Sequence, residues 1–85
     1  MNYLEIEQKI KKILAEQLNL DISKIDLNSH LVDDLGMDSF NSVEIIFELE
    51  DNFLIKISDV EIMEAKTVKD IVDCVVVQMS AKEKN

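Results

Sequence analysis

The chain contains one glycine, Gly36, and no proline among its 85 residues. Because these two residue types form most tight turns, their scarcity favours helices joined by loops over a fold of strands and hairpins. A chain of this length supports one modest core and no second domain. Its composition, 47% apolar and 32% charged, is typical of a folded protein. The sequence therefore predicts a single all-α domain.

Apolar residues recur at intervals of three and four along most of the chain, the spacing that places them on one face of a helix. We predict a four-helix bundle with three longer helices, one short helix and a long loop between the first two helices. The expected helices cover residues 2–18, 39–53 and 59–64 and a last segment capped by Thr67, and the loop covers residues 19–38. We assign residues 1–80 to the domain and residues 81–85 to a disordered polar tail.

Each segment has an expected inner face. The inner residues of the helices are Ile6, Ile10, Ile13, Leu14 and Leu18, then Ile45, Ile46, Leu49 and Phe53, then Val68, Ile71, Val72, Val75 and Met79. Six apolar residues are expected to hold the long loop over the core: Ile22, Ile25, Leu27, Leu31, Val32 and Leu35. In the same loop we expect His30 to be a polar connector and Met37 to be exposed.

The charge of the chain restricts its partners. Eighteen acidic residues against nine lysines give a formal net charge of −9, which repels nucleic acid and anionic membranes and favours partners with basic patches. The single cysteine, Cys74, permits no internal disulfide and fits a reducing compartment; we expect it to be a small core residue. The first twelve residues lack the apolar stretch expected of a signal peptide, and no apolar run is long enough to span a membrane. We expect a cytoplasmic monomer without membrane insertion.

The residues with a possible chemical role lie at the end of the long loop and the start of the helix that follows it. Ser39 is expected in the first turn of a helix, with Asp38 as the N-cap and Gly36 just before it. Its hydroxyl should be exposed, and the free N–H groups and dipole of a helix N-terminus favour an attached or bound phosphate. Helix capping alone would also explain an Asp-Ser pair.

Other chemistries fit these residues less well. A nucleophilic serine of the hydrolase type would need flanking glycines, where this chain has Met37 and Asn41, and a base, for which His30 is the single candidate. Neither of two registers of the acidic loop gives an EF-hand calcium site, whether the loop starts at Asp33 or places Gly36 at position six. One Cys and one His cannot form a structural zinc site. We therefore predict no metal site and no catalytic residue.

The segment from Asp34 to Phe40, followed by Val43 and Glu44, resembles the phosphopantetheine-attachment motif of acyl carrier proteins, Leu-Gly-x-Asp-Ser-Leu. The resemblance extends over nearly the whole chain: residues 10–18 resemble the first helix of the family, 49–53 the end of the second, and 57–59 and 67–68 the starts of the third and fourth. Four positions depart from the family pattern. Phe40 replaces the usual leucine, Ser58 replaces a common proline, and Ile62 and Ala65 appear exchanged.

The resemblance implies a carrier rather than an enzyme. A phosphopantetheinyl transferase would move 4′-phosphopantetheine from coenzyme A onto Ser39, within a motif completed by Gly36 and Asp38. The thiol of the arm would carry acyl groups as thioesters to acyl-transferring and chain-elongating enzymes. Fatty-acid synthesis is the expected setting, with polyketide, nonribosomal-peptide or lipid-modifying pathways as alternatives. An unmodified acidic interaction protein is the remaining alternative, and a serine hydrolase is the least favoured.

Two surfaces follow from the same residues. Between Lys24 and Lys56 the chain has eight acidic residues and no lysine or arginine, and we predict that basic partners dock on the helix in this region. The predicted partner-binding residues are Phe40, Glu44, Phe47, Glu48 and Asp51. The resemblance also implies a core that opens to shelter the acyl chain, with pocket residues Leu35, Ile46, Leu49, Phe53, Ile57, Ile62, Ala65 and Ile71.

Overall fold

Four α-helices and one short 3-10 turn form the protein. The structure is a computed structural model, and it describes residues 2–83. The elements are α1 (Tyr3–Leu18), η1 (Ile22–Lys24), α2 (Ser39–Phe53), α3 (Asp59–Glu64) and α4 (Val68–Glu83). Three helices are long and one is short, which confirms the predicted all-α four-helix bundle with a long first loop. The described residues contain no β-strand beyond one isolated bridge between His30 and Thr67.

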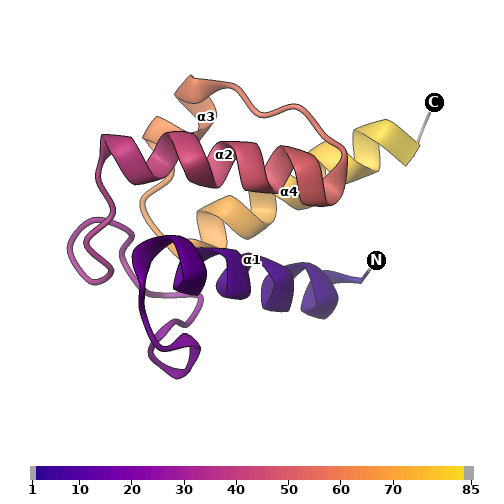
Figure 1. The fold of residues 1–85 in the computed structure, drawn as a ribbon. Coiled ribbons are helices and arrows are strands. Elements are labelled where there is room, and N and C mark those ends of the chain that lie inside the picture. Colours follow the sequence, from indigo (N-terminus) through magenta and orange to yellow (C-terminus); the bar gives the residue numbers. More distant parts are fainter. Residues whose placement is uncertain (1, 84–85) are drawn as a thin grey trace.

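The helices pack with α1 against both α2 and α4. Figure 1 shows the short helix α3 beside the first half of α2, at the end of the bundle where the long loop lies. The last turns of α4 extend past the opposite end of α2. The beginning and the end of α2 are therefore covered by different parts of the chain.

Side-chain caps fix where the helices begin. The Asn2 side chain accepts from the backbone N–H of Glu5 at 2.9 Å and starts α1. Ser58 Oγ accepts from Glu61 N at 3.2 Å and starts α3. Thr67 caps α4 as predicted, since its Oγ1 accepts from the backbone N–H of Asp70 at 3.3 Å. Each cap satisfies a first-turn N–H group that has no partner within its own helix.

The core contains the inner faces expected from the helical periodicity. All of these predicted helix residues are buried except Leu18 and Met79, which are partly buried against the core. Ile55 adds to the core from the segment after α2. Cys74 is half-buried against the core, as a small apolar residue would be. Burial of this apolar surface is the main source of the fold's stability.

The long loop is ordered by backbone hydrogen bonds to the start of α4. Leu31 N donates to Lys66 O at 2.8 Å, and Lys69 N donates to Leu27 O at 3.0 Å. Val68 N donates to Ser29 O at 3.1 Å. These bonds hold the loop over the bundle without a regular element.

The apolar residues of this loop were predicted correctly in part. Ile25, Leu31 and Leu35 are buried, and Leu27 is partly buried against the core. The prediction was wrong for Ile22 and Val32, which are exposed by 43% and 55%.

Each of the two exposed residues has a local explanation. Ile22 begins a turn of only three residues, none of which is buried, and the C-cap residue that follows the turn, Ile25, is the one that reaches the core. Val32 lies within a tight turn closed by Gly36 N, which donates to Val32 O at 3.0 Å. In both places the chain turns too sharply for every apolar side chain to face inward.

The prediction was also wrong for Met37, which is buried rather than exposed, with 7% of its surface accessible. The chain reverses at Gly36, and Met37 N then donates to Leu31 O at 2.9 Å. This bond draws Met37 back toward the bundle. A reversal of this kind leaves no periodic signal in the sequence.

The last helix is longer than expected. α4 continues to Glu83, so residues 81–83, which we expected in the polar tail, are helical. The remaining two residues of that tail, 84–85, lie outside the described residues. None of the helices within residues 2–83 combines the length and the apolar character that a membrane span requires.

Candidate functional site

Ser39 is the first residue of α2 and is exposed. Asp38 is the N-cap: its Oδ1 accepts from Asn41 N at 2.9 Å, and Asn41 Oδ1 accepts from Asp38 N at 3.3 Å. This reciprocal pair holds the Asp38 carboxylate against the first turn of the helix. The Ser39 hydroxyl makes no hydrogen bond to any of residues 2–83, since its backbone oxygen, and not Oγ, accepts from Ser42. The hydroxyl is therefore accessible and unused by the fold.

The first turn of α2 also offers free donors. Across residues 2–83, the backbone N–H groups of Ser39 and Phe40 have no acceptor, because the cap satisfies Asn41 and Ser42 instead. Free N–H groups and the positive end of the helix dipole stabilise a phosphate at such a position. The residues present therefore fit a phosphodiester on Ser39.

Gly36 shapes the turn that leads to Ser39. It has a φ of +73°, in the left-handed region that residues with a Cβ rarely adopt. A Cβ at this position would meet no atom within 4 Å. The glycine is thus required by backbone conformation and not by lack of space.

The same turn is closed by polar contacts on its other side. Asp34 Oδ2 accepts from His30 N at 2.7 Å, and His30 Nδ1 accepts from Asp33 N at 3.1 Å. His30 is therefore a connector within the loop, as predicted. These contacts fix the path of the chain just before α2.

A hollow of about 370 Å³ lies beside Ser39, between α2, α3 and the end of the long loop. Most of its lining is apolar: Val32, Met37, Val43, Ile46, Ile62, Met63 and Ala65. The polar part of the lining is Asp38, Ser39, Ser42 and Asp59. A group attached to Ser39 would thus have an apolar surface next to its attachment point.

The predicted acyl-pocket residues divide into two groups. Ile46, Ile62 and Ala65 line this hollow. The other five lie in the core and do not line the hollow: Leu35, Leu49, Phe53, Ile57 and Ile71. The structure brings the first group to Ser39 and leaves the second group behind it.

Four apolar residues of the lining were missed from the sequence. Val43 lies four residues after Ser39, so it shares a helix face with Ser39 and could have been found from that spacing. Val32 and Met37 reach the hollow through the irregular turn at Gly36. Met63 is 81% exposed on the short helix α3, and no pattern in the sequence indicated that it would line the hollow.

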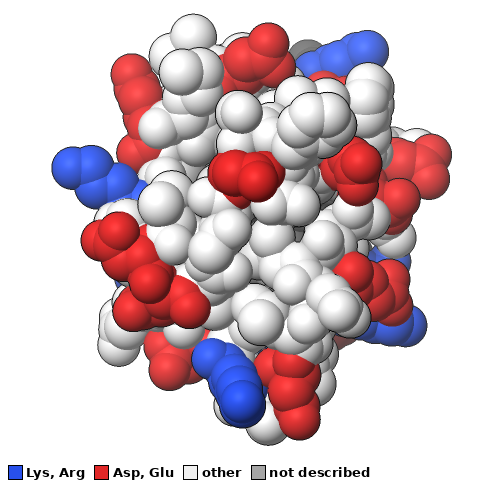
Figure 2. Space-filling model, turned by 60° about the vertical axis from the view of Figure 1, so that its left-hand side comes forward, with Lys and Arg blue, Asp and Glu red and all other residues white. Residues whose placement is uncertain are grey.

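The predicted partner-binding residues all lie on the exposed face of α2. Glu44, Glu48 and Asp51 are exposed, and Phe40 and Phe47 are exposed by 81% and 66%. Figure 2 shows the side of the molecule near the start of α2: acidic side chains surround an uncharged area, with the lysines at its margins. Large apolar side chains exposed among acids are typical of an interaction surface.

The described residues offer little for the competing chemistries. His30 makes no hydrogen bond to Ser39 and accepts from Asp33 N instead, so Ser39 has no base in contact. Burial raises the pKa of the Cys74 thiol, and the Glu61 carboxylate, 3.8 Å from Cys74 Sγ, raises it further. The thiol is thereby disfavoured as a thiolate nucleophile. No group of three His, Cys, Asp or Glu residues among those described could hold a metal ion.

Comparison with known proteins identifies a family. Residues 8–75 match the family model described as the phosphopantetheine attachment site. The chain is 46% identical over 65 residues to an acyl carrier protein of Onion yellows phytoplasma, a match that covers 76% of this chain and 86% of the relative. This result confirms the resemblance seen in the sequence. It also confirms the predicted cofactor, covalently bound 4′-phosphopantetheine.

Solved structures agree with the sequence relatives. A Mycobacterium tuberculosis protein provisionally named as an acyl carrier protein superposes with a TM-score of 0.79 at 40% identity, covering 85% of this chain and 96% of that one. An apo doublet acyl carrier protein from prodigiosin biosynthesis superposes with a TM-score of 0.76 at 29% identity, covering 89% of this chain and 37% of that longer one. The four-helix fold is thus shared with these carriers.

Proposed function

Because the chain belongs to the acyl carrier protein family, we propose that 4′-phosphopantetheine is attached to Ser39 and that Gly36 and Asp38 position this serine for the attachment. The observation that carries the proposal is the exposed Ser39 hydroxyl, which has no hydrogen bond to residues 2–83 and stands at a capped helix N-terminus. Acyl carrier proteins carry acyl groups and are not catalysts. We extend this non-enzymatic role to the present chain.

Each residue of the site has a part in this function. Ser39 supplies the ester oxygen that links the chain to the phosphate of the arm. Asp38 accepts from Asn41 N and so caps the first turn of α2 without using the Ser39 hydroxyl. The free N–H groups of Ser39 and Phe40 favour a negative group at this place. When attached, the arm supplies a terminal thiol on which acyl groups are held as thioesters. Met37, Ile46 and Ile62 give the neighbouring hollow an apolar lining.

The hollow beside Ser39 supports a further part of the proposal, shelter for the acyl chain. Ile46 and Ile62 are buried and lie between the hollow and the core. Leu49 and Ile71 belong to the same buried core as these two residues. Each methylene that leaves water contributes roughly 0.8 kcal/mol, which offsets part of the cost of opening a small core.

The acidic face of α2 is the proposed docking surface, defined by Phe40, Glu44, Phe47, Glu48 and Asp51. Its partners are a phosphopantetheinyl transferase and acyl-transferring and chain-elongating enzymes with basic patches. Opposite charges accelerate the encounter, and the phenylalanines add apolar contact. With Glu44 and Glu48 both replaced by lysine, kcat/KM of the transferase at low salt should fall by about tenfold or more. Glu16→Lys on α1 is the matched control; equal rates for all three proteins would remove this surface from the account.

The pathway is part of the proposal as well. We place the carrier in fatty-acid synthesis, as a cytoplasmic monomer; the match to an acyl carrier protein over 86% of its own length supports the carrier role in general. The similarity to a doublet carrier from prodigiosin biosynthesis supports keeping a polyketide, nonribosomal-peptide or lipid-modifying pathway as the alternative. Neither pathway changes the role of Ser39.

The attachment is tested by intact mass after incubation with coenzyme A and a broad-specificity phosphopantetheinyl transferase. The chain should gain the mass of one arm, and Ser39→Ala should gain none. Ser42→Ala is the matched control, because Ser42 is one helical turn away and its hydroxyl donates to Ser39 O. An unmodified wild-type chain would instead favour the acidic interaction protein.

A further inference from the structure

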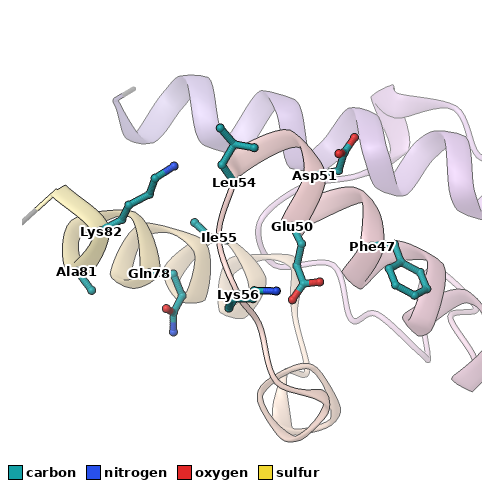
Figure 3. Close-up of a pocket in the computed structure, with 9 residues that line it drawn as sticks. All are labelled: Phe47, Glu50, Asp51, Leu54, Ile55, Lys56, Gln78, Ala81 and Lys82. Carbon is teal, nitrogen blue, oxygen red and sulfur yellow. The ribbon is translucent and has the colours of Figure 1, made fainter. Parts of the chain in front are cut away.

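A second hollow, of about 760 Å³, lies at the opposite end of α2. It is formed by the second half of α2, the segment 54–56 and the last turns of α4, as Figure 3 shows. Phe47 and Glu50 project from α2 on one side, and Gln78 and Lys82 project from α4 on the other. The hollow is therefore separate from the one beside Ser39.

Leu54, on the rim of this hollow, has an unusual conformation. It is the C-cap of α2 with φ 54° and ψ 49°, in the left-handed region that is unfavourable for a residue with a Cβ. The corresponding position of α1 is Asn19, a residue that tolerates this conformation. Leu54 is also 71% exposed, so packing within the fold does not offset its strain. A strained and exposed leucine indicates a contact outside the chain.

Two other apolar residues line the same hollow as Leu54. Phe47 is 66% exposed on the α2 side, and the largely buried Ile55 forms part of the floor. Together the three residues give a hollow with an apolar rim and base. Protein interfaces place their buried apolar contacts in hollows of this kind.

The charges around the hollow are of both signs. Lys56 and Lys82 make no ion pair with the described side chains. Asp51 lies on the α2 side of the same hollow. The chain has no lysine or arginine from residue 25 to residue 55, and in this hollow Lys56 and Lys82 bring positive charge next to Phe47 and Asp51 of the acidic docking surface.

We propose that the docking surface continues across Phe47 and Asp51 into this second hollow, and that a segment of a chain-elongating partner enzyme occupies it. The segment places an apolar side chain against Leu54, a basic residue opposite Asp51 and an acidic residue opposite Lys82. A second copy of the chain fits less well, since the net charge of −9 opposes self-association. The inference rests on the proposed carrier function and adds to it a site that selects among basic partners.

Two variants test this site. Leu54→Asn removes both the apolar contact and the strain, and Lys82→Glu reverses one charge. The matched controls are Leu4→Asn and Lys12→Glu, exposed positions on α1 that do not line the hollow. Every protein is first converted to the arm-carrying form and checked by mass. The KM of each acylated carrier is then measured with a condensing enzyme encoded by the same genome.

We expect each of the two variants to raise KM about fivefold or more, with the effect of Lys82→Glu shrinking at high salt, while the controls stay within about twofold. Leu54→Asn should at the same time raise the thermal midpoint by about 4 °C, because the strain is relieved. A loss of binding in a more stable protein cannot be explained by a structural role.

An unchanged KM for Leu54→Asn and Lys82→Glu would overturn the inference while leaving the carrier function intact. Sedimentation equilibrium that shows a dimer, abolished by Leu54→Asn, would assign the hollow to a second copy and would also overturn it. A wild-type chain that gains no arm would refute the proposed function and this inference with it.

Discussion

Replacing Gly36 with alanine tests how the turn before Ser39 is built. The φ of +73° is unfavourable for alanine by roughly 1–2 kcal/mol. No further steric cost is expected, because a Cβ would meet no atom within 4 Å. Alanine also restricts the unfolded chain, which returns about 0.4–1 kcal/mol. The net loss should therefore be about 1 kcal/mol, a small part of the stability of such a domain.

Urea unfolding measures this loss directly. A change of about 1 kcal/mol lowers the urea midpoint by about 1 M when m is near 1 kcal/mol/M, and it lowers the thermal midpoint by about 4–8 °C. Gly36→Asn is the matched control and should lose less, since asparagine tolerates the left-handed region. Gly36→Ala should still accept the arm at Ser39.

Two results would refute this reasoning. An alanine variant as stable as the wild type would mean that Gly36 does not adopt the left-handed turn. A loss above about 3 kcal/mol would mean that the turn is closely packed and that space, rather than conformation, requires the glycine.

Three other predictions concern different parts of the molecule. The backbone N–H groups of Lys66 and Thr67, which donate to Asp70 Oδ2 at 2.8 and 3.1 Å, lower the pKa of Asp70 below its ordinary value of 3.8. The unfolded chain therefore binds a proton at Asp70 more readily than the folded protein does, so the stabilisation by ionised Asp70 is complete above about pH 4 and is lost as the pH falls through the folded pKa. Urea titrations at several pH values should show that the difference in unfolding free energy between the wild type and Asp70→Asn shrinks in that range. A difference that stays constant with pH would contradict the argument. Because the pKa of its thiol is raised, Cys74 in the folded protein should react with iodoacetamide at pH 8 more slowly than the thiol of the arm. Cys74 should react faster once the protein is unfolded in urea. Equal rates for the two thiols in the folded protein would show that Cys74 is not buried as described. Lengthening a saturated acyl chain from four to eight carbons should raise the free energy of unfolding by up to about 3 kcal/mol if the added methylenes are sheltered, and a falling thermal midpoint would exclude shelter.

The sequence was sufficient to predict the regular parts of the fold. Periodic apolar residues such as Ile10, Ile46 and Val75 gave the helices and their inner faces, because a helix repeats its environment every three to four residues. The helix starts were equally predictable, since Asp38 and Thr67 are capping residues directly before apolar periods. The elements themselves thus follow from local physical rules.

The irregular parts did not follow from such rules. The burial of Met37 and the exposure of Val32 depend on the reversal at Gly36 and on hydrogen bonds to the start of α4. A pattern of apolar residues carries no information on these long-range bonds. For the hollow beside Ser39, the sequence consequently predicted only those lining residues that lie on a periodic helix face or match the pattern of the family. The proposed role of Leu54 could not be predicted at all.

The central claim is that the arm is attached to Ser39, and peptide mapping tests it most directly. Because no lysine or arginine occurs between Lys24 and Lys56, trypsin releases one peptide, residues 25–56, that contains three serines: Ser29, Ser39 and Ser42. Fragmentation of this peptide from the arm-carrying protein should place the added mass on Ser39 alone. An added mass on Ser29 or Ser42, or a peptide that stays unmodified after full incubation with the transferase and coenzyme A, would contradict the account.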